Sequence, residues 1–310
     1  MSTPAPDEWK RLGADHDLLG RRVFAVDLAA GQARAEAPQR GRADAGRDAP
    51  GADRPLLMLH GFPTCGWDWA PIAEQLAQGR RVIIPDLLGF GFSEKPRGPY
   101  TIAEQADLVI ALLRKLGLLD VELDLVSHDM GDTVACELLA RRRASGEGPR
   151  VRKVVMLNGG LLPELHRPIL TQKLLRSPLA PAVVKLMTRA RFGKALASVF
   201  GPKTQPSEKE LDEHFMLVSR DEGLQNYPQL IGYIAERRQH RARWMGALTN
   251  LDVPLRLVWG DVDPVAVWPI AEEIKRLRPA TEVVRLEGIG HYPQLEAPQR
   301  VLEGIRAFLG

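Results

Sequence analysis

The segment SHDMG at residues 127–131 places an aspartate, Asp129, where a catalytic nucleophile could stand. An apolar run precedes this segment, and a helical pattern over residues 133–141 follows it. Small residues two positions before and after the centre suit a very tight turn from a strand into a helix, because larger side chains would clash there. Such a turn lifts the Asp129 side chain to the end of the sheet. The alternative is that Asp129 is simply a helix N-cap, a position that Asp favours.

A second segment, HGFP at residues 60–63, follows the first apolar run of the expected core. It could form an oxyanion loop, in which the backbone N–H groups of Phe62 and Met130 point at a developing negative charge. We expect His60 to support this loop by hydrogen bonding and to border the substrate pocket. A loop of this kind beside Asp129 favours a nucleophilic role for the aspartate over a capping role.

An acid and a histidine follow Asp129 along the chain. Asp263 lies in GDVDP, residues 260–264, after another apolar run, and could orient a catalytic histidine. Asp261 is the rival for this role, and we prefer Asp263 because Asp261 lies nearest to the glycine turn. Of the seven histidines, only His291 lies in a glycine-flanked loop after the last expected strand. The order nucleophile, acid, histidine is one that strand-end catalytic triads use.

Alternating strand and helix patterns must position these residues. Short apolar runs bounded by polar or turn residues predict strands at residues 56–60, 82–85, 121–127, 151–158, 254–260 and 282–286. Amphipathic patterns predict helices at residues 101–117, near 270–277 and from 298 onward. Buried strands that alternate with helices indicate an α/β fold, with a mostly parallel central sheet and helices on both faces.

The alternation stops within residues 159–249, where helical patterns are separated by Pro and Gly. We expect this insert to be a helical cap over the carboxyl ends of the strands, where open α/β sheets bind ligands. The core then has two parts, residues 1–158 and 250–310. Residues 31–55 carry no apolar side chains other than Ala and Pro, which predicts a flexible surface loop.

With these motifs the chain resembles the α/β-hydrolase superfamily, in its aspartate-nucleophile branch of epoxide hydrolases and haloalkane dehalogenases. Over residues 158–298 it resembles the mesoderm-specific transcript family of hydrolase-like proteins. The segments that carry this closer resemblance are NGGLLPELHRPILTQKLL, FGPKTQPSE, RARWMGAL and GHYPQLEAP, together with SHDMGDTVACELL, which precedes that range at residues 127–139. The resemblance implies the α/β-hydrolase fold with an inserted helical cap, and it implies little about the substrate.

An ionised carboxylate suits displacement at an sp³ carbon, which gives an alkyl-enzyme ester on Asp129. His291, oriented by Asp263, would then activate the water that hydrolyses the ester, while the Phe62 and Met130 amides hold the oxyanion. Attack on an ordinary ester would instead give an anhydride, so plain esterase activity is disfavoured.

The leaving group separates the candidate reactions. A halide needs N–H donors around it, which the side chains of Met130 and Phe62 lack. An epoxide needs a proton or a strong hydrogen bond as its ring opens, which in this branch tyrosines of the cap supply. Tyr233 is the preferred acid and Tyr227 the second, and we find no partner tyrosine between residues 158 and 223. We therefore expect an epoxide hydrolase. The alternatives are a haloalkane or haloacid dehalogenase, and a hydrolase-fold binding or scaffold protein with a vestigial triad.

Other aromatic and basic residues are open to two interpretations. Trp67 and Trp268 could line the substrate pocket, or they could pack helices and cap on the sheet. A basic run falls on a helix that we expect over residues 230–243. We interpret this run, which comprises Arg237, Arg238, Arg241 and Arg243, as a solvated helix face rather than an anion-binding site.

Composition narrows the remaining classes. Lys and Arg total 42 against 39 for Asp and Glu, a net charge of +3, which is too even to indicate a nucleic-acid partner. Two cysteines exclude a disulfide scaffold, and no metal or cofactor motif is present. No apolar run approaches the length of a membrane-spanning helix, and no signal sequence is visible, so we expect a cytoplasmic protein. We expect it to be a monomer or a homodimer. The expected substrate is small, apolar and uncharged.

Overall fold

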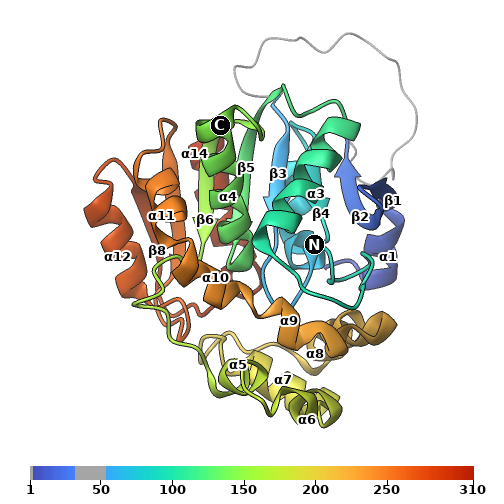
Figure 1. The fold of residues 1–310 in the computed structure, drawn as a ribbon. Helices are drawn as coiled ribbons and strands as arrows, with labels where there is room; N and C mark the ends of the chain where they lie inside the picture. Colours follow the sequence, from blue (N-terminus) through green and yellow to red (C-terminus); the bar gives the residue numbers. More distant parts are fainter. Residues whose placement is uncertain (1–2, 32–53) are drawn as a thin grey trace.

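The computed structural model describes residues 3–31 and 54–310, and it contains an eight-stranded sheet (Figure 1). The strands lie in the order β1-β2-β4-β3-β5-β6-β7-β8. Their bounds are β1 Gly13–Leu18, β2 Arg21–Leu28, β3 Leu56–Leu59, β4 Val82–Pro85, β5 Glu122–His128, β6 Arg150–Leu157, β7 Leu255–Gly260 and β8 Glu282–Leu286. The six strands expected from the sequence are all present within two residues of their expected bounds. The predicted flexible loop lies almost wholly outside the described residues.

The sheet is parallel from β4 through β8, in agreement with the sequence prediction. Every residue of β3 and β4 is buried, which accounts for their continuous apolar runs. The first part of the chain adds an element that the sequence patterns did not indicate. After helix α1 (Pro6–Arg11), β1 and β2 form an antiparallel hairpin, and β2 pairs antiparallel with β4.

Helices cover both faces of the sheet (Figure 1). One face carries α3 (Ile102–Lys115), α4 (Met130–Ser145) and α11 (Arg241–Thr249), which lie side by side. The other face carries α2 (Ala70–Leu76) and α14 (Pro298–Leu309). Helix α12 (Trp268–Leu277) packs against β7 and β8. The buried side chains of these layers form one continuous hydrophobic core. No helix in the described part of the chain is both long and apolar enough to cross a bilayer.

The segment between β6 and β7 contains helices joined by loops and no strand, as expected for residues 159–249. It contains α5 Leu170–Leu175, α6 Ala180–Lys185, α7 Arg189–Ala197, α8 Glu208–Ser219, the 3₁₀ helix η2 Arg220–Asn226, α9 Tyr227–Leu230, α10 Tyr233–Gln239 and α11. Helices α5 to α9 gather at one end of the sheet, and α11 runs back along α4 (Figure 1). The prediction of a single helix over residues 230–243 is wrong. The backbone leaves helical geometry at His240, which separates α10 from α11.

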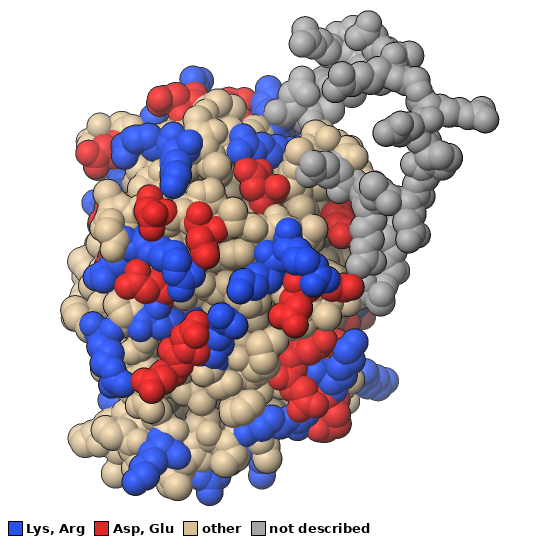
Figure 2. Space-filling view, turned by 90° about the vertical axis from the view of Figure 1, so that its right-hand side faces the viewer, with Lys and Arg blue, Asp and Glu red and all other residues tan. Residues whose placement is uncertain are grey.

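Charged side chains of both signs are intermixed on the face shown in Figure 2, without a broad area of either sign. Among the buried ion pairs, one cluster lies in the core of the sheet. Asp124 on β5 is 0% exposed and accepts hydrogen bonds from Arg80 Nη1 at 3.0 Å and from Arg152 Nε at 2.8 Å. This cluster ties the start of β4 to β5 and β6.

Replacing Asp124 with Asn would leave two partly buried guanidinium groups without their anion. We expect the free energy of unfolding to fall by roughly 3–5 kcal/mol in urea titrations, the usual cost of breaking a buried pair. The matched control is Asp27→Asn, which breaks the more exposed pair with Arg81 and should cost less than about 1 kcal/mol. Equal losses in the two variants would contradict the buried role of Asp124.

Candidate active site

Asp129 stands in a strained turn between β5 and α4. Its backbone angles are φ 45° and ψ −107°, a conformation that non-glycine residues rarely adopt, and the residue is 2% exposed. A Cβ at Gly131 would lie 2.5 Å from the carbonyl oxygen of Leu59, and one at Gly61 would lie 2.7 Å from Asp129 Cβ. These close approaches explain why the turn needs small neighbours. The side chain makes no N-cap hydrogen bond to α4, which disfavours the capping interpretation.

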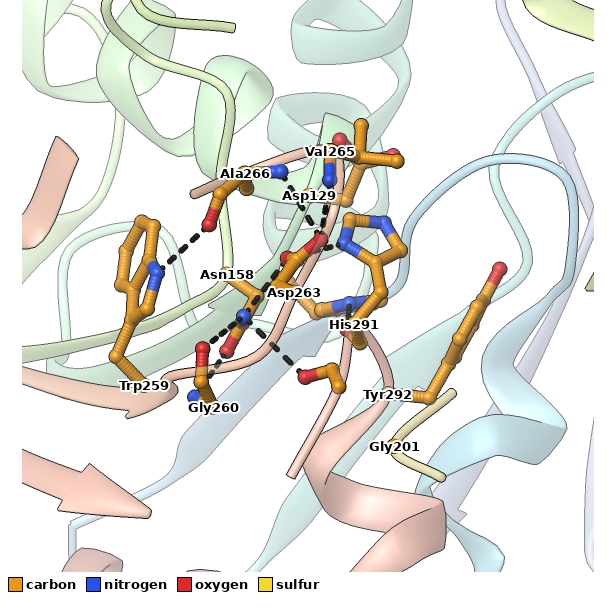
Figure 3. Close-up of polar contacts among 12 residues, drawn as sticks. Asp129, Asn158, Gly201, Trp259, Gly260, Asp263, Val265, Ala266, His291 and Tyr292 are labelled. Atoms are coloured by element: carbon orange, nitrogen blue, oxygen red, sulfur yellow. Dashed lines mark hydrogen bonds and ion pairs between the residues drawn. The ribbon is translucent and has the colours of Figure 1, made fainter. Parts of the chain in front are cut away.

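His291 lies between Asp263 and Asp129 (Figure 3). Its Nδ1–H donates to Asp263 Oδ2 at 2.7 Å. The other carboxylate oxygen of Asp263 accepts the backbone N–H groups of Val265 at 2.7 Å and Ala266 at 3.0 Å. Asn158, at the end of β6, donates from Nδ2 to Asp263 Oδ2 at 2.8 Å, so the acid is fixed on every side.

The rival acid, Asp261, lies elsewhere. It accepts Arg285 Nε at 2.9 Å and the Gly288 N–H at 2.8 Å, and it makes no contact with His291. The structure thus brings Asp263, and not Asp261, to the histidine. Asn158 is a residue that the sequence analysis missed, although its position as the polar last residue of a predicted strand was a usable signal.

The loop after β3 contacts the carboxylate of Asp129. The Phe62 N–H donates to Asp129 Oδ2 at 3.2 Å. His60 donates from Nδ1 to the Gly61 carbonyl at 2.9 Å, and its Nε2 accepts the Leu87 N–H at 2.9 Å. Burial lowers the pKa of His60 to about 4, so the ring is a neutral support of the loop. Met130 is the first residue of α4, where backbone N–H groups have no partner within the helix.

The two candidate tyrosines have different environments. Tyr233 is 1% exposed, and its hydroxyl lies 3.1 Å from Asp129 Oδ2 and 3.4 Å from Oδ1. Burial, and then the charge of Asp129, raise the pKa of Tyr233 well above its ordinary value, so it stays a phenol. Tyr227 donates its hydroxyl to the Pro63 carbonyl at 3.0 Å, and its ring packs on Phe62. Only Tyr233 therefore reaches the Asp129 carboxylate.

Arg237 is the main residue that the sequence analysis misjudged. It is 1% exposed, and its Nη2 donates to the backbone carbonyl of Asp129 at 2.8 Å and to Oδ1 at 3.2 Å. Its Nε donates to Thr133 Oγ1 at 2.8 Å, and its guanidinium stacks on the Tyr233 ring. The interpretation of the basic run as a solvated face holds for exposed Arg238 and is wrong for Arg237. The signal was the spacing, since positions 233 and 237 share one helix face.

The charges of the site are coupled. Burial alone would raise the pKa of Asp129, but Arg237 and then His291 oppose it and bring the pKa down to about 2. Burial alone would lower the pKa of His291, but the charge and hydrogen bond of Asp263, and then the charge of Asp129, raise it to about 9. At neutral pH the resting site therefore holds a carboxylate at Asp129 and an imidazolium at His291.

Two further histidines surround the site. The ring of His128 packs on that of His291, and its Nε2–H donates to the His291 carbonyl at 2.7 Å. Burial, and then the charge of His291, lower the pKa of His128 to about 3. His166, between β6 and α5, has a buried Nε2 without a hydrogen-bond partner in the described residues. Burial, and then Arg237, lower its pKa to about 4, so the ring is neutral.

A small apolar cavity of about 60 Å³ adjoins the triad. From the core it is lined by Phe62, His291 and Tyr292, and from the inserted segment largely by apolar side chains of α5 and α7 such as Leu175 and Phe192. Its lining suits an uncharged organic molecule.

The structure does not place His60, Trp67 or Trp268 in the cavity wall. The Trp67 indole donates to the Pro4 carbonyl at 2.9 Å and packs on His214 of α8. Trp268 lies beneath the guanidinium of Arg285 at 4.9 Å. Both tryptophans pack between elements. Within residues 3–31 and 54–310, no three His, Cys, Asp or Glu side chains form a cluster that could hold a metal ion.

Comparison with known proteins identifies the family and the fold. The chain matches the family model described as the alpha/beta hydrolase fold over residues 54–298. It is 38% identical over 314 residues to the mesoderm-specific transcript homolog protein of Bos taurus, which covers 99% of this chain and 88% of the relative. It is 36% identical over 266 residues to the putative hydrolase LipZ of Mycobacterium tuberculosis, which covers 85% of this chain and 91% of the relative.

Two solved structures have a similar fold. The epoxide hydrolase CorEH gives a TM-score of 0.73 at 20% identity, with 96% of this chain and 97% of that chain covered. The haloalkane dehalogenase DbeA from Bradyrhizobium elkani gives 0.74 at 22% identity, with the same coverage of 96% and 97%. The chain therefore belongs to the α/β-hydrolase family, and within it to the group of the mesoderm-specific transcript proteins.

Replacing Asp263 with Asn removes the charge that raises the pKa of His291. We expect this pKa to fall from about 9 toward its ordinary value of about 6.5, because burial is then opposed only by the weaker effects of Asp129 and Glu296. Histidine NMR titration measures the shift. The matched control is Asp261→Asn, which should leave the His291 titration unchanged. A shift of equal size in the control would contradict the pairing of His291 with Asp263.

Proposed function

We propose that this hydrolase opens epoxides to diols through an ester on Asp129. The observation that carries the proposal is the Tyr233 hydroxyl, 3.1 Å from the Asp129 carboxylate and held as a phenol by its surroundings. An epoxide carbon at Asp129 would place the ring oxygen within reach of this acid. Asp129 attacks the carbon, the C–O bond breaks, and the ring oxygen takes the proton of Tyr233. The apolar cavity supports an uncharged substrate.

The second step uses His291 and Asp263. Once Asp129 is esterified, it carries no charge, and one of the causes that raise the pKa of His291 is gone. His291 then gives up its proton to solvent more readily, takes a proton from water, and directs the hydroxide to the Asp129 carbonyl carbon. The Phe62 and Met130 N–H groups stabilise the oxyanion. The products are the diol and the free carboxylate, and the Tyr233 proton is restored from solvent.

Dehalogenation of haloalkanes is the second candidate. The side chains at Phe62 and Met130 have no N–H to offer a halide. Arg237, however, brings N–H donors to the same carboxylate, and such donors could stabilise a departing halide. The third alternative is a binding or scaffold protein with a vestigial triad. The bonded His291–Asp263 pair beside an ionised Asp129 opposes that alternative.

Ester trapping on Asp129 tests the reaction class. In a His291→Ala variant the first step proceeds and the ester is not hydrolysed, so mass spectrometry should find Asp129 labelled. An epoxide adds its whole mass, whereas a haloalkane adds only its alkyl group. We expect labelling by epoxides such as styrene oxide and weaker labelling by 1-bromohexane. The control is the double variant with Asp129→Asn, which should stay unlabelled at this position.

Two results of the trapping experiment would overturn the proposal. Halide release with haloalkanes and no label from any epoxide would establish the dehalogenase instead. The absence of any label across both substrate panels would favour the binding-protein alternative.

Tyr233→Phe tests the acid. Loss of the donor should slow ester formation from epoxides by roughly 10²–10⁴-fold, the usual contribution of a general acid. Tyr227→Phe is the matched control, because its hydroxyl bonds to the Pro63 carbonyl and not to Asp129. We expect less than about a tenfold loss there, measured by single-turnover labelling. A larger effect at Tyr227 would reverse the assignment of the acid.

A further inference from the structure

Arg237 is held in place independently of the charge on Asp129. Its Nε bonds to Thr133 Oγ1 and its Nη2 to the backbone carbonyl of Asp129, both at 2.8 Å. Neither partner changes when the Asp129 carboxylate reacts. The third nitrogen, Nη1, is buried and has no hydrogen-bond acceptor among the described residues. A guanidinium so fixed presents one free, charged edge beside the nucleophile.

Gly160 and His166 pack against that free edge. A Cβ at position 160 would overlap Arg237 Nη1 and would lie 2.6 Å from Cδ2 of His166. The absence of a side chain at Gly160 therefore lets the guanidinium and the imidazole approach each other. His166 Nε2 is likewise buried without a partner in the described part of the chain. Two buried nitrogen-bearing groups with unused hydrogen-bonding capacity thus lie close together near Asp129.

The proposed reaction moves negative charge away from Asp129. In the resting site the Asp129 carboxylate lies 3.2 Å from Arg237 Nη2 and balances its charge. Ester formation removes that negative charge and creates an equal one on the atom that leaves the carbon. A buried guanidinium without an anion is costly. The site therefore favours a transition state in which the new negative charge stays close to Arg237.

We propose that the free Nη1 edge of Arg237 hydrogen-bonds the substrate atom that leaves the carbon, which makes Arg237 a catalytic residue of the first step. This rests on the function proposed above, in which the leaving atom is an epoxide ring oxygen, a strong hydrogen-bond acceptor, and it adds Arg237 to the residues of that step. The Asp129 oxygen forms the new C–O bond, and the electron pair of the broken C–O bond goes to the ring oxygen. Arg237 stabilises that oxygen until Tyr233 protonates it, and it gives up no proton itself.

The test measures ester formation on Asp129 in the His291→Ala background. The probes are styrene oxide, whose alkoxide needs strong stabilisation, and 1-iodohexane, whose iodide needs little. Arg237→Gln should slow labelling by styrene oxide at least about a hundredfold and labelling by 1-iodohexane less than about tenfold. Arg238→Gln, an exposed neighbour on the same helix, is the control and should change neither rate.

A second variant tests the same edge without removing Arg237. In Gly160→Ala the new methyl group displaces Nη1, so the same selective loss with styrene oxide is expected. Gly246→Ala, where an added Cβ meets no atom within 4 Å, is its control. This pair keeps the proposal testable should Arg237→Gln fail to fold.

The outcomes separate the two proposals. No label from either probe in the His291→Ala parent, with Arg237 intact, overturns the proposed function together with this inference. A labelled parent in which Arg237→Gln or Gly160→Ala slows both probes equally, or slows neither, overturns the inference alone. Faster labelling in Arg237→Gln would also overturn it, because Arg237 would then only restrain the nucleophile.

Discussion

A carboxylate that is 2% exposed must be kept ionised, and the rest of the site depends on this constraint. Burying a charge without partners is expensive, and a protonated Asp129 could not attack carbon. The partners come from distant segments: the Phe62 N–H after β3, Arg237 on α10, and His291 after β8. Neither the sheet nor the inserted segment alone provides this environment. The inserted segment is therefore an electrostatic part of the site as well as a wall of the cavity.

Sheet topology explains why the central residues could be predicted from the sequence. Asp129 and Asp263 each follow a parallel strand, and the carboxyl ends of parallel strands meet at one edge of the sheet. A strand pattern followed by a polar residue therefore predicts position as well as secondary structure. The tight turn at Asp129 is equally local, since the approach of Gly131 to the preceding strand requires a small residue. Local rules of this kind need no knowledge of the tertiary fold.

The remaining features depend on packing between distant segments, which periodicity does not reveal. Of the four arginines in the basic run, only Arg237 is fully buried, and its partners Thr133 and Asp129 come from a segment about a hundred residues earlier in the chain. Trp67 packs against the N-terminal segment and α8, contacts that no local pattern specifies. In the β1–β2 hairpin, β1 is short, largely polar and at the edge of the sheet, where burial imposes little pattern. Strand β2 is mostly apolar and buried, and its antiparallel pairing with β4 is a contact that no local pattern specifies.

Under the proposed mechanism the same charges impose an order on the two steps. In the resting site the Asp129 carboxylate helps to keep His291 protonated, so the histidine cannot activate water. Esterification removes that carboxylate charge, while Asp263 still orients the ring through its 2.7 Å hydrogen bond. The base therefore becomes more available once there is an ester to hydrolyse. Arg237, anchored to Thr133 and to the backbone, keeps its position through this change. The Asp129 carboxylate thus serves as the nucleophile of the first step, and its charge also influences the pKa of His291, the base that activates water in the second step.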